Sequence, residues 1–205
     1  MAPAKEKPLD PVSLQEALRG QWIGSRILVL EQTSSTNDEA FRLGLEGAEE
    51  GLVIFAEHQT AGRGRHGNRW ESCAGKGLWF SLLLRPALSL SAATRLTNWA
   101  AGGIVAAIDH ETGVAARIKP PNDVFVADRK VAGVLVELRA QPRQPHLAIV
   151  GIGINVNQRA EDFSASLQEK ATSLALVRNE TIDREGLAIC LLRQLQTTYD
   201  AILAP

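Results

Sequence analysis

The chain has 205 residues and a formal net charge of −1, with 22 Lys and Arg against 23 Asp and Glu. A hydrophobic share of 45% is enough for one substantial core, so one domain, or one domain with a small appendage, is expected. The near-neutral charge argues against bulk nucleic-acid binding, and any basic function must therefore be local.

The cysteines and the start of the chain argue against a disulfide-rich, metal-binding, secreted or membrane-spanning protein. Cys73 and Cys190 lie far apart in sequence and indicate neither a disulfide framework nor a Cys/His metal site, so no metal held by the protein is expected. The first residues contain no apolar signal core, and no apolar run approaches the ~20 residues of a membrane span. A cytoplasmic location without membrane attachment is the default expectation.

The first part of the chain predicts two strands separated by a helix. The first ten residues are rich in Pro and charge, which favours disorder. An aliphatic stretch at 27–30 predicts a strand, and the Ser-Thr-Asn cluster at 35–37 predicts a helix start. That helix should end near 44–47, and the apolar run at 52–55 predicts a buried strand.

The rest of the chain predicts a central strand, a long helix, an antiparallel meander and a final helix. The central strand should stop at Arg85-Pro86, and Ser91 can cap the long helix. The expected ranges are 78–84 for the strand, 91 to about 109 for the helix, 124–126, 131–138 and 147–155 for the meander, 127–130 for its first turn, and about 183–203 for the final helix.

This order of elements indicates an α+β fold (α/β-type). Strands in series with helices packed against them predict a mixed, largely antiparallel β-sheet flanked by helices. We expect residues 1–26 to form an N-terminal tail and lead-in segment, and residues 27–205 to form the main domain.

A loop rich in glycine and arginine follows the strand predicted at 52–55. Its glycines let the backbone approach a ligand closely, and its arginines stay charged at neutral pH. Because like charges on an empty loop repel one another, the loop makes sense if it orders around an anion. The residues are Gly62, Gly64 and Gly67, with Arg63, Arg65 and Arg69 between and after them.

Two familiar phosphate-binding motifs do not explain this loop. The spacing of its glycines matches the dinucleotide-binding fingerprint, but no helix start follows, and Pro86 stands near the position where an acidic residue is needed. A Walker loop is excluded because no Gly-Lys-Ser/Thr follows. A basic loop that only meets solvent or nucleic acid is the open alternative.

Several separate motifs together resemble the catalytic domain of biotin protein ligases, in the family's order and over roughly residue 27 to the C-terminus. They are Ser35-Thr36-Asn37, Gln59-Thr60-Ala61-Gly62-Arg63-Gly64-Arg65, Trp70-x-Ser72, Ser81-Leu82-Leu83-Leu84-Arg85-Pro86, Lys119-x-Pro121-Asn122-Asp123, Lys130-x-x-Gly133-Val134-Leu135-x-Glu137 and Gly151-x-Gly153-x-Asn155, with Ala171-Thr172-Ser173-Leu174 as a weaker echo.

The resemblance implies a class II aminoacyl-tRNA synthetase-like catalytic domain and an ATP-dependent biotin ligase. Such an enzyme forms biotinyl-5'-AMP from biotin and ATP, with Mg²⁺ bridging phosphates. It then transfers biotin to a lysine of a biotin carboxyl carrier protein. Because two anions must be brought together, positioning and fixed positive charge are the main catalytic means.

The resemblance also implies roles for individual residues. Lys130, Arg65 and Asp123 form the catalytic set, in which Asp123 would orient the acceptor lysine and help remove its proton. Biotin would contact Ser35, Thr36, Asn37, Gln59, Gly62, Arg63, Gly64, Arg65, Lys130 and Gly133. The nucleotide would contact Arg63, Arg65, Trp70, Asn122, Lys130 and Asn155.

Each of these residue types also has a purely structural explanation. Ser, Thr and Asn cap helices regardless of function, and a tryptophan often only packs a core. Lys130 could be an exposed hairpin lysine, and Asp123 could bond the local backbone of a turn. The arginines could be solvated loop charges, and Asn122 and Asn155 could be turn or strand-end residues.

The chain departs from the family pattern in three ways. Pro120 replaces the usual tryptophan of Lys-Trp-Pro-Asn-Asp, and His66 and Asn68 stand where arginines are common, so altered nucleotide affinity is expected. Neither a winged helix nor the usual C-terminal β domain is recognisable. DNA binding is therefore not expected, while pairing into a homodimer stays open. A lipoate or octanoate transferase and a binding module without turnover are the alternative functions.

Overall fold

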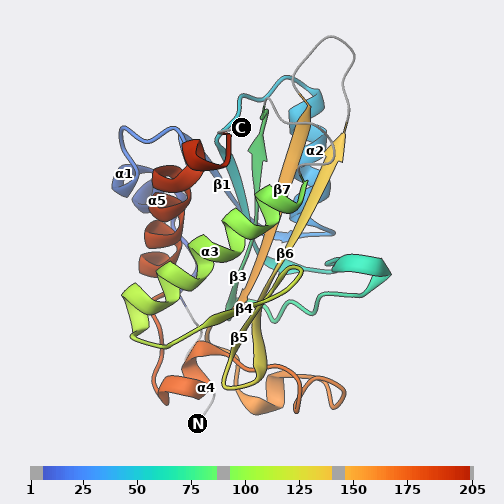
Figure 1. The fold of residues 1–205 in the computed structure, drawn as a ribbon, viewed down its shortest axis with the longest axis vertical. Coiled ribbons are helices and arrows are strands. Elements are labelled where there is room, and N and C mark those ends of the chain that lie inside the picture. The colour runs from blue at the N-terminus through green and yellow to red at the C-terminus, as the bar shows by residue number, and fades with distance from the viewer. Residues whose placement is uncertain (1–6, 87–92, 140–145, 204–205) are drawn as a thin grey trace.

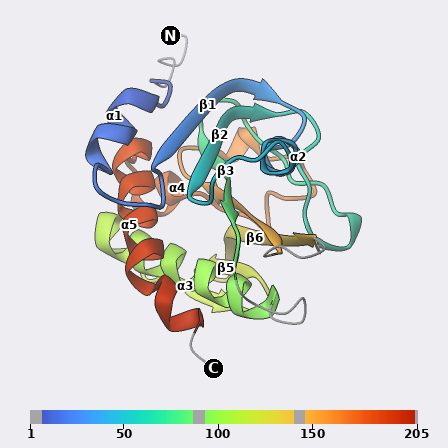
Figure 2. The ribbon, with the colours of Figure 1, turned by 90° about the horizontal axis from the view of Figure 1, so that it is seen from above.

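The computed structural model describes residues 7–86, 93–139 and 146–203, which form one seven-stranded sheet with helices on both faces (Figures 1 and 2). The strands are β1 (Arg26–Thr33), β2 (Leu52–Gln59), β3 (Gly77–Leu84), β4 (Arg117–Lys119), β5 (Asp123–Val126), β6 (Arg129–Arg139) and β7 (Leu147–Asn155). The α-helices are α1 (Pro11–Ala17), α2 (Thr36–Leu45), α3 (Ala93–Thr112), α4 (Leu174–Arg178) and α5 (Arg184–Leu203).

The sheet is mixed and largely antiparallel, as the sequence predicts. Its order is β1-β2-β3-β7-β6-β5-β4, and β1 pairs parallel with β2 across the connection made by α2. The remaining pairs are antiparallel, and β5, β6 and β7 follow one another as the expected meander. The α+β fold class is therefore confirmed.

The main core lies between the sheet and helices α1, α3 and α5, which cover one face (Figure 2). All eight residues of β3 are buried, because this central strand is covered on both faces, and that is why its sequence is a continuous apolar run. Helices α3 and α5 approach closely at Gly103, where an added Cβ would lie 2.7 Å from Leu195 Cδ2. The space between the two helices thus depends on the glycine.

Helix α2 lies on the opposite face over a smaller apolar cluster that includes Ala40, Ile54 and Leu83. It sits close to the sheet at Gly44, where an added Cβ would lie 2.5 Å from Leu83 Cδ1. Helix α2 contacts β2, β3 and β7. It is the one α-helix on this face in the described chain, so no helix covers the parts of β6 and β7 beside its N-terminus.

The N-terminal segment corrects one expectation. The predicted disorder of the first ten residues is wrong for Leu9 and Asp10; residues 1–6 lie outside the described residues. Leu9 is buried and its N–H donates to Glu57 Oε1 at 2.8 Å, while Asp10 caps α1 by accepting from the N–H of Val12. Leu14 of α1 reaches the same core as α5, so the lead-in segment packs against the domain.

Three further local features complete the comparison with the expected elements. The turn at Ala127 and Asp128 is confirmed, with positive φ at both residues, as a tight hairpin turn requires. The cap expected at Ser91 lies outside the described residues. Helix α1, strand β4 and helix α4 are additions that the sequence patterns do not predict. In the part of the chain that the structure describes, no helix combines the length and apolar character needed to cross a membrane.

Candidate functional site

A cavity of about 250 Å³ opens beside the N-terminus of α2. This helix lies on the face of the sheet opposite α3 and α5 (Figure 2). The walls of the cavity are the start of α2, the end of β2, the glycine-arginine loop, the segment before β5, and the middle of β6 and β7. The cavity therefore gathers residues from six of the eight motifs that the sequence analysis singles out, while the motifs at 81–86 and 171–174 contribute none of its lining residues. Its polar lining residues are Ser35, Thr36, Asn37, Gln59, Arg63, Arg65, His66, Asn68, Arg69, Trp70, Asn122, Asp123 and Lys130.

The start of α2 is bound to the end of β2 rather than capped by its own side chain. Ser35 occupies the N-cap position, but its side chain makes no capping bond. Instead, Gln59 Oε1 accepts from the N–H of Thr36 at 2.9 Å and from its Oγ1 at 3.1 Å. Ser35, Thr36 and Gln59 are almost fully buried, and all three line the cavity.

Ser81 on β3 extends this polar cluster. Its Oγ lies 2.8 Å from Thr36 Oγ1 and 2.5 Å from Asn37 Oδ1, within hydrogen-bond distance of both. Asn37 Nδ2 donates to Glu137 Oε2 at 2.5 Å. Neutral hydroxyl and amide groups thus form one end of the cavity, and their mutual hydrogen bonds fix their orientation.

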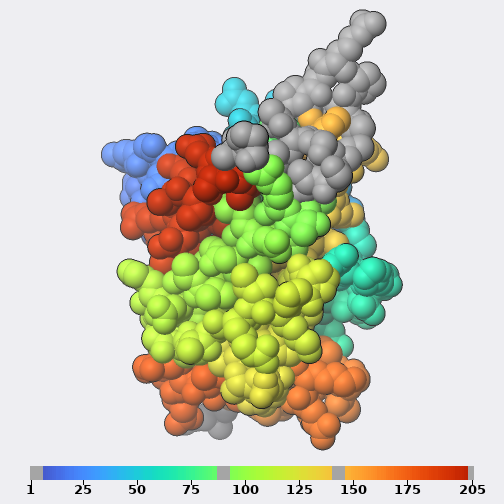
Figure 3. Space-filling view, viewed as in Figure 1, coloured from blue at the N-terminus to red at the C-terminus, as the bar shows by residue number. Residues whose placement is uncertain are grey.

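The glycine-arginine loop is a small hairpin that projects from the molecule, in teal at the edge of the space-filling view (Figure 3). Its ends are joined by hydrogen bonds from the N–H of Gly64 to Asn68 O at 2.7 Å and from the N–H of Trp70 to Gly62 O at 2.9 Å. A Cβ at Gly62 would lie 2.7 Å from Trp70 O, so the close pairing requires glycine there. Gly62 therefore shapes the loop and does not itself line the cavity.

Lys130 and Asp123 meet at the other end of the cavity, as members of adjacent strands. Lys130 Nζ lies 2.7 Å from Asp123 Oδ1 and 5.2 Å from the centre of the Trp70 ring. The backbone of Lys130 is held by residues 170–172, through its N–H to Lys170 O and through Thr172 N–H to its carbonyl. This pairing is what the weak motif at 171–174 contributes.

The Trp70 ring packs against two glycines, Gly133 and Gly153. A Cβ at Gly153 would lie 2.5 Å from Trp70 Cε2, and one at Gly133 would lie 3.1 Å from Trp70 Cζ3. The two glycines are register partners on β6 and β7. The sequence analysis expects Gly133 to contact biotin but assigns no contact to Gly151 or Gly153, which also line the cavity. The Gly151-x-Gly153-x-Asn155 motif is the sequence signal that points to both.

The two candidate asparagines differ in position. Asn122 lines the cavity, and its Nδ2 donates to Val134 O at 2.9 Å. Asn155 does not line it: the side chain is buried, donates to Thr172 O and accepts from Gln158 Nε2. Its amide supports the segment that holds Lys130. Pro121 lines the cavity and Pro120 does not, and the peptide bond between them is cis.

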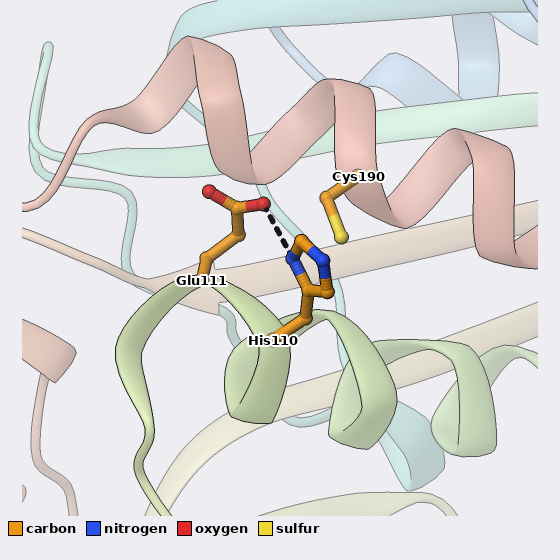
Figure 4. A group of neighbouring side chains, drawn as sticks. All are labelled: His110, Glu111 and Cys190. Atoms are coloured by element: carbon orange, nitrogen blue, oxygen red, sulfur yellow. Dashed lines mark hydrogen bonds and ion pairs between the residues drawn. The ribbon is translucent and has the colours of Figure 1, made fainter.

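Three side chains of types that can ligate a metal lie together outside the cavity lining. Cys190 of α5 points toward His110 and Glu111 of α3 (Figure 4), and their ligand atoms lie within 4.8 Å of one another. His110 Nδ1 is 2.9 Å from Glu111 Oε1. Burial raises the pKa of the Cys190 thiol to about 11, and Glu111 adds to the shift, so a thiolate ligand is disfavoured.

This thiol gives a testable pH dependence. Its pKa rises from 9.0 to about 11 in the folded protein, so between these values the folded state binds more protons than the unfolded state. The stability present below pH 9 is therefore lost as pH rises toward 11. We expect the urea midpoint to fall less steeply with pH in Cys190→Ala than in the wild type. Parallel midpoint curves would contradict the assignment.

Comparison with known proteins agrees with the motifs. Residues 29–155 match the biotin/lipoate A/B protein ligase family. The chain is 36% identical over 195 residues to the bifunctional ligase/repressor BirA of Bacillus subtilis, which covers 95% of the chain and 60% of that relative. It is 38% identical over 200 residues to the biotin–[acetyl-CoA-carboxylase] ligase of Mycobacterium tuberculosis, covering 92% of the chain and 70% of that relative.

A solved structure supports the same relationship. The biotin protein ligase from Aquifex aeolicus in complex with biotin and ATP superposes with a TM-score of 0.73 at 32% identity, over 85% of the chain and 70% of that protein. The chain spans about 60% of the length of its Bacillus relatives and 70% of the Mycobacterium tuberculosis ligase. Sequence, fold and cavity agree that the chain belongs to the biotin/lipoate A/B protein ligase family.

Proposed function

We propose that the protein is an ATP-dependent biotin ligase. It forms biotinyl-5'-AMP and pyrophosphate from biotin and ATP, and then transfers the biotinyl group to a lysine of a biotin carboxyl carrier protein. The observation that carries the proposal is the cavity lining, which has neutral hydroxyl and amide groups beside α2 and the cation Lys130 at the other end, against Asp123 and Trp70, with Arg65 of the loop also in the lining. Biotin has the matching chemistry, since a neutral urea and a carboxylate stand at its two ends.

The neutral end would bind the urea. Ser35, Thr36, Asn37 and Gln59 offer donors and acceptors in one buried cluster. A site built to pair such groups rejects analogues that leave its own polar groups unmatched. Gly64 and Gly133 would let the backbone approach the ring and chain of biotin closely.

The cationic end would bring the biotin carboxylate to the α-phosphate of ATP. In the first step a carboxylate oxygen attacks the α-phosphorus and pyrophosphate leaves. Lys130 and Arg65 would stabilise the charge that spreads over the phosphoryl oxygens. Trp70 and Asn122 would border the nucleotide, while Asn155 would act from behind by supporting residues 170–172.

In the second step the acceptor lysine attacks the acyl carbon and AMP leaves. A free lysine has a pKa of ~10.4, so its amine must lose a proton before it can attack. Asp123 lies at this end of the cavity and would orient the amine and receive the proton.

Mg²⁺ would enter with ATP as part of the substrate. Asp123 is the one carboxylate among the described residues that line the cavity, and it already contacts Lys130. Mg²⁺ commonly binds through one or two carboxylates together with substrate phosphates, so this lining suits an ion carried by the nucleotide. We place the reaction in the cytoplasm, without DNA or membrane as a partner, and a homodimer is compatible with it.

Biotin-dependent ATP–pyrophosphate exchange, followed by labelling of a carrier domain, tests the proposal. Exchange that requires biotin, with transfer to a carrier lysine, is the expected result. Exchange supported by lipoate in place of biotin would instead indicate the lipoate branch of the family. Tight biotin binding without exchange would show a binding module.

Gly151→Ala should weaken biotin binding by at least about tenfold, or ~1.4 kcal/mol. The added Cβ would collide with Asn37 Oδ1 and displace the amide from Ser81 at the urea end. Titration calorimetry with biotin measures the effect. Gly102→Ala on α3 is the matched control, because no atom lies within 4 Å of its Cβ. Equal biotin affinities in the two variants would show that Asn37 does not contribute to biotin binding.

A further inference from the structure

Arg63 and Arg65 are chemically alike and two positions apart, yet their surroundings differ. The Arg63 guanidinium pairs with both oxygens of Asp38 at 2.7 Å, and its Nη2 lies 3.3 Å from Glu137 Oε2. One cation therefore faces two carboxylates, and hydrogen bonding to Asp38 raises the pKa of Arg63. A guanidinium neutralised in this way has little positive charge left to attract an anion.

Arg65 has no such partner. Its side chain lines the cavity and makes no hydrogen bond or ion pair with any residue in 7–86, 93–139 or 146–203. Lys130, another cation in the lining, contacts a single carboxylate, Asp123. Arg69 also lines the cavity without a carboxylate partner in the described part of the chain, but its guanidinium donates to Thr60 O at 3.4 Å. Among the three loop arginines, Arg65 is therefore the one whose side chain has no partner in the described residues, and its charge is available to a bound phosphate or carboxylate.

The carboxylates that hold Arg63 belong to rigid parts of the fold. Asp38 is in the first turn of α2, and Glu137 is on β6. Glu137 Oε2 also accepts from Asn37 Nδ2 at 2.5 Å, so one oxygen joins the polar cluster at α2 to the loop. Single exposed ion pairs contribute little to stability, but a bidentate arginine in a network of several charges is the recognised exception.

We propose a division of labour between the two arginines, which rests on the ligase function proposed above. Asp38 and Glu137 are positioning residues that fasten the loop to α2 and β6 through Arg63. Arg65, carried on the fastened loop, contacts the anionic substrate groups. Breaking the fastening lets the loop move and weakens substrate binding, whereas removing Arg65 removes charge from the reacting phosphate.

The test combines a readout of loop order with kinetics. Trypsin cleaves after Arg65 and Arg69, both on the loop, and Asp38→Asn with Glu137→Gln leaves these cleavage sites intact. In the ligand-free protein we expect this double variant to be cut there about tenfold faster. In biotin-dependent exchange it should raise KM for ATP and biotin and leave kcat nearly unchanged, because the loop still closes at saturation.

Three further variants make the test specific. Asp38→Glu, with Glu137 unchanged, keeps a carboxylate at position 38 and should show the slow cleavage and low KM of the wild type. Glu39→Gln removes the neighbouring carboxylate, which pairs with Arg42 and not with Arg63, and should behave as wild type. Arg65→Ala should lower kcat while cleavage after Arg69 stays slow.

Two results would overturn the inference. One is a double variant that is cleaved at the wild-type rate and keeps the wild-type KM for ATP and biotin. The other is Arg63→Ala lowering kcat as far as Arg65→Ala does without faster cleavage after Arg69. Proteolysis needs no activity, so if the wild type shows no exchange, the ligase function fails while the cleavage rates still decide whether Asp38 and Glu137 fasten the loop.

Discussion

Lys130→Ala is expected to lower kcat/KM of biotin-dependent ATP–pyrophosphate exchange by about 10²- to 10³-fold, the usual effect of removing one fixed charge-stabilising group. Lys130 Nζ is held at the cavity by its contact with Asp123 and by the position of its backbone against residues 170–172. The ammonium group is thus in place before substrates arrive, and its loss leaves Asp123 as a carboxylate facing incoming anions.

Steady-state exchange kinetics with both substrates varied measure this effect. A fall in kcat would show that Lys130 acts in the transition state, while a rise in KM alone would show uniform binding. Arg129→Ala, at the neighbouring position and outside the cavity lining, is the matched control and should keep the wild-type rate. Full activity in Lys130→Ala would exclude this lysine from the adenylation step.

Arg184→Ala is expected to lower the free energy of unfolding by about 3–5 kcal/mol, the range for removing one partner of a buried ion pair. The Arg184 side chain is 4% exposed and donates to Glu57 Oε2 at 2.9 Å, to Gly77 O at 3.0 Å and to Lys7 O at 2.9 Å. It joins the N-terminal segment, β2, β3 and α5, and its loss leaves the Glu57 carboxylate without a counter-charge.

Urea denaturation followed by circular dichroism measures this loss. Arg178→Ala is the control, because Arg178 pairs with Glu180 on the surface, where both side chains are about half exposed. Exposed pairs of this kind contribute about 0–1 kcal/mol, so the control should stay near the wild type. Equal midpoints for the two variants would show that the Arg184 network contributes no more than a surface pair.

The strands and long helices could be predicted because the reasons for them are local. The apolar runs in β2 and β3 and the helical spacing in α3 and α5 follow from burial of neighbouring residues on a regular backbone. Strand β4 could not be found in this way, since its three residues are exposed and it exists through pairing with β5. Helix α1 was missed because Pro and charge dominate the segment before it, although Leu9 is buried.

The sequence by itself determined the motif set, the fold class and the expectation of a phosphate- and biotin-binding site. These could be read from it because glycine positions, apolar runs and motif order are properties of short segments of the chain. Only the tertiary structure decided which groups meet. It placed Asp123 against Lys130, put Asn155 behind the cavity, and gave Arg63 but not Arg65 two carboxylate partners. Such pairings join residues as far apart in sequence as Arg63 and Glu137, and they depend on strand register and helix packing, which no local pattern specifies.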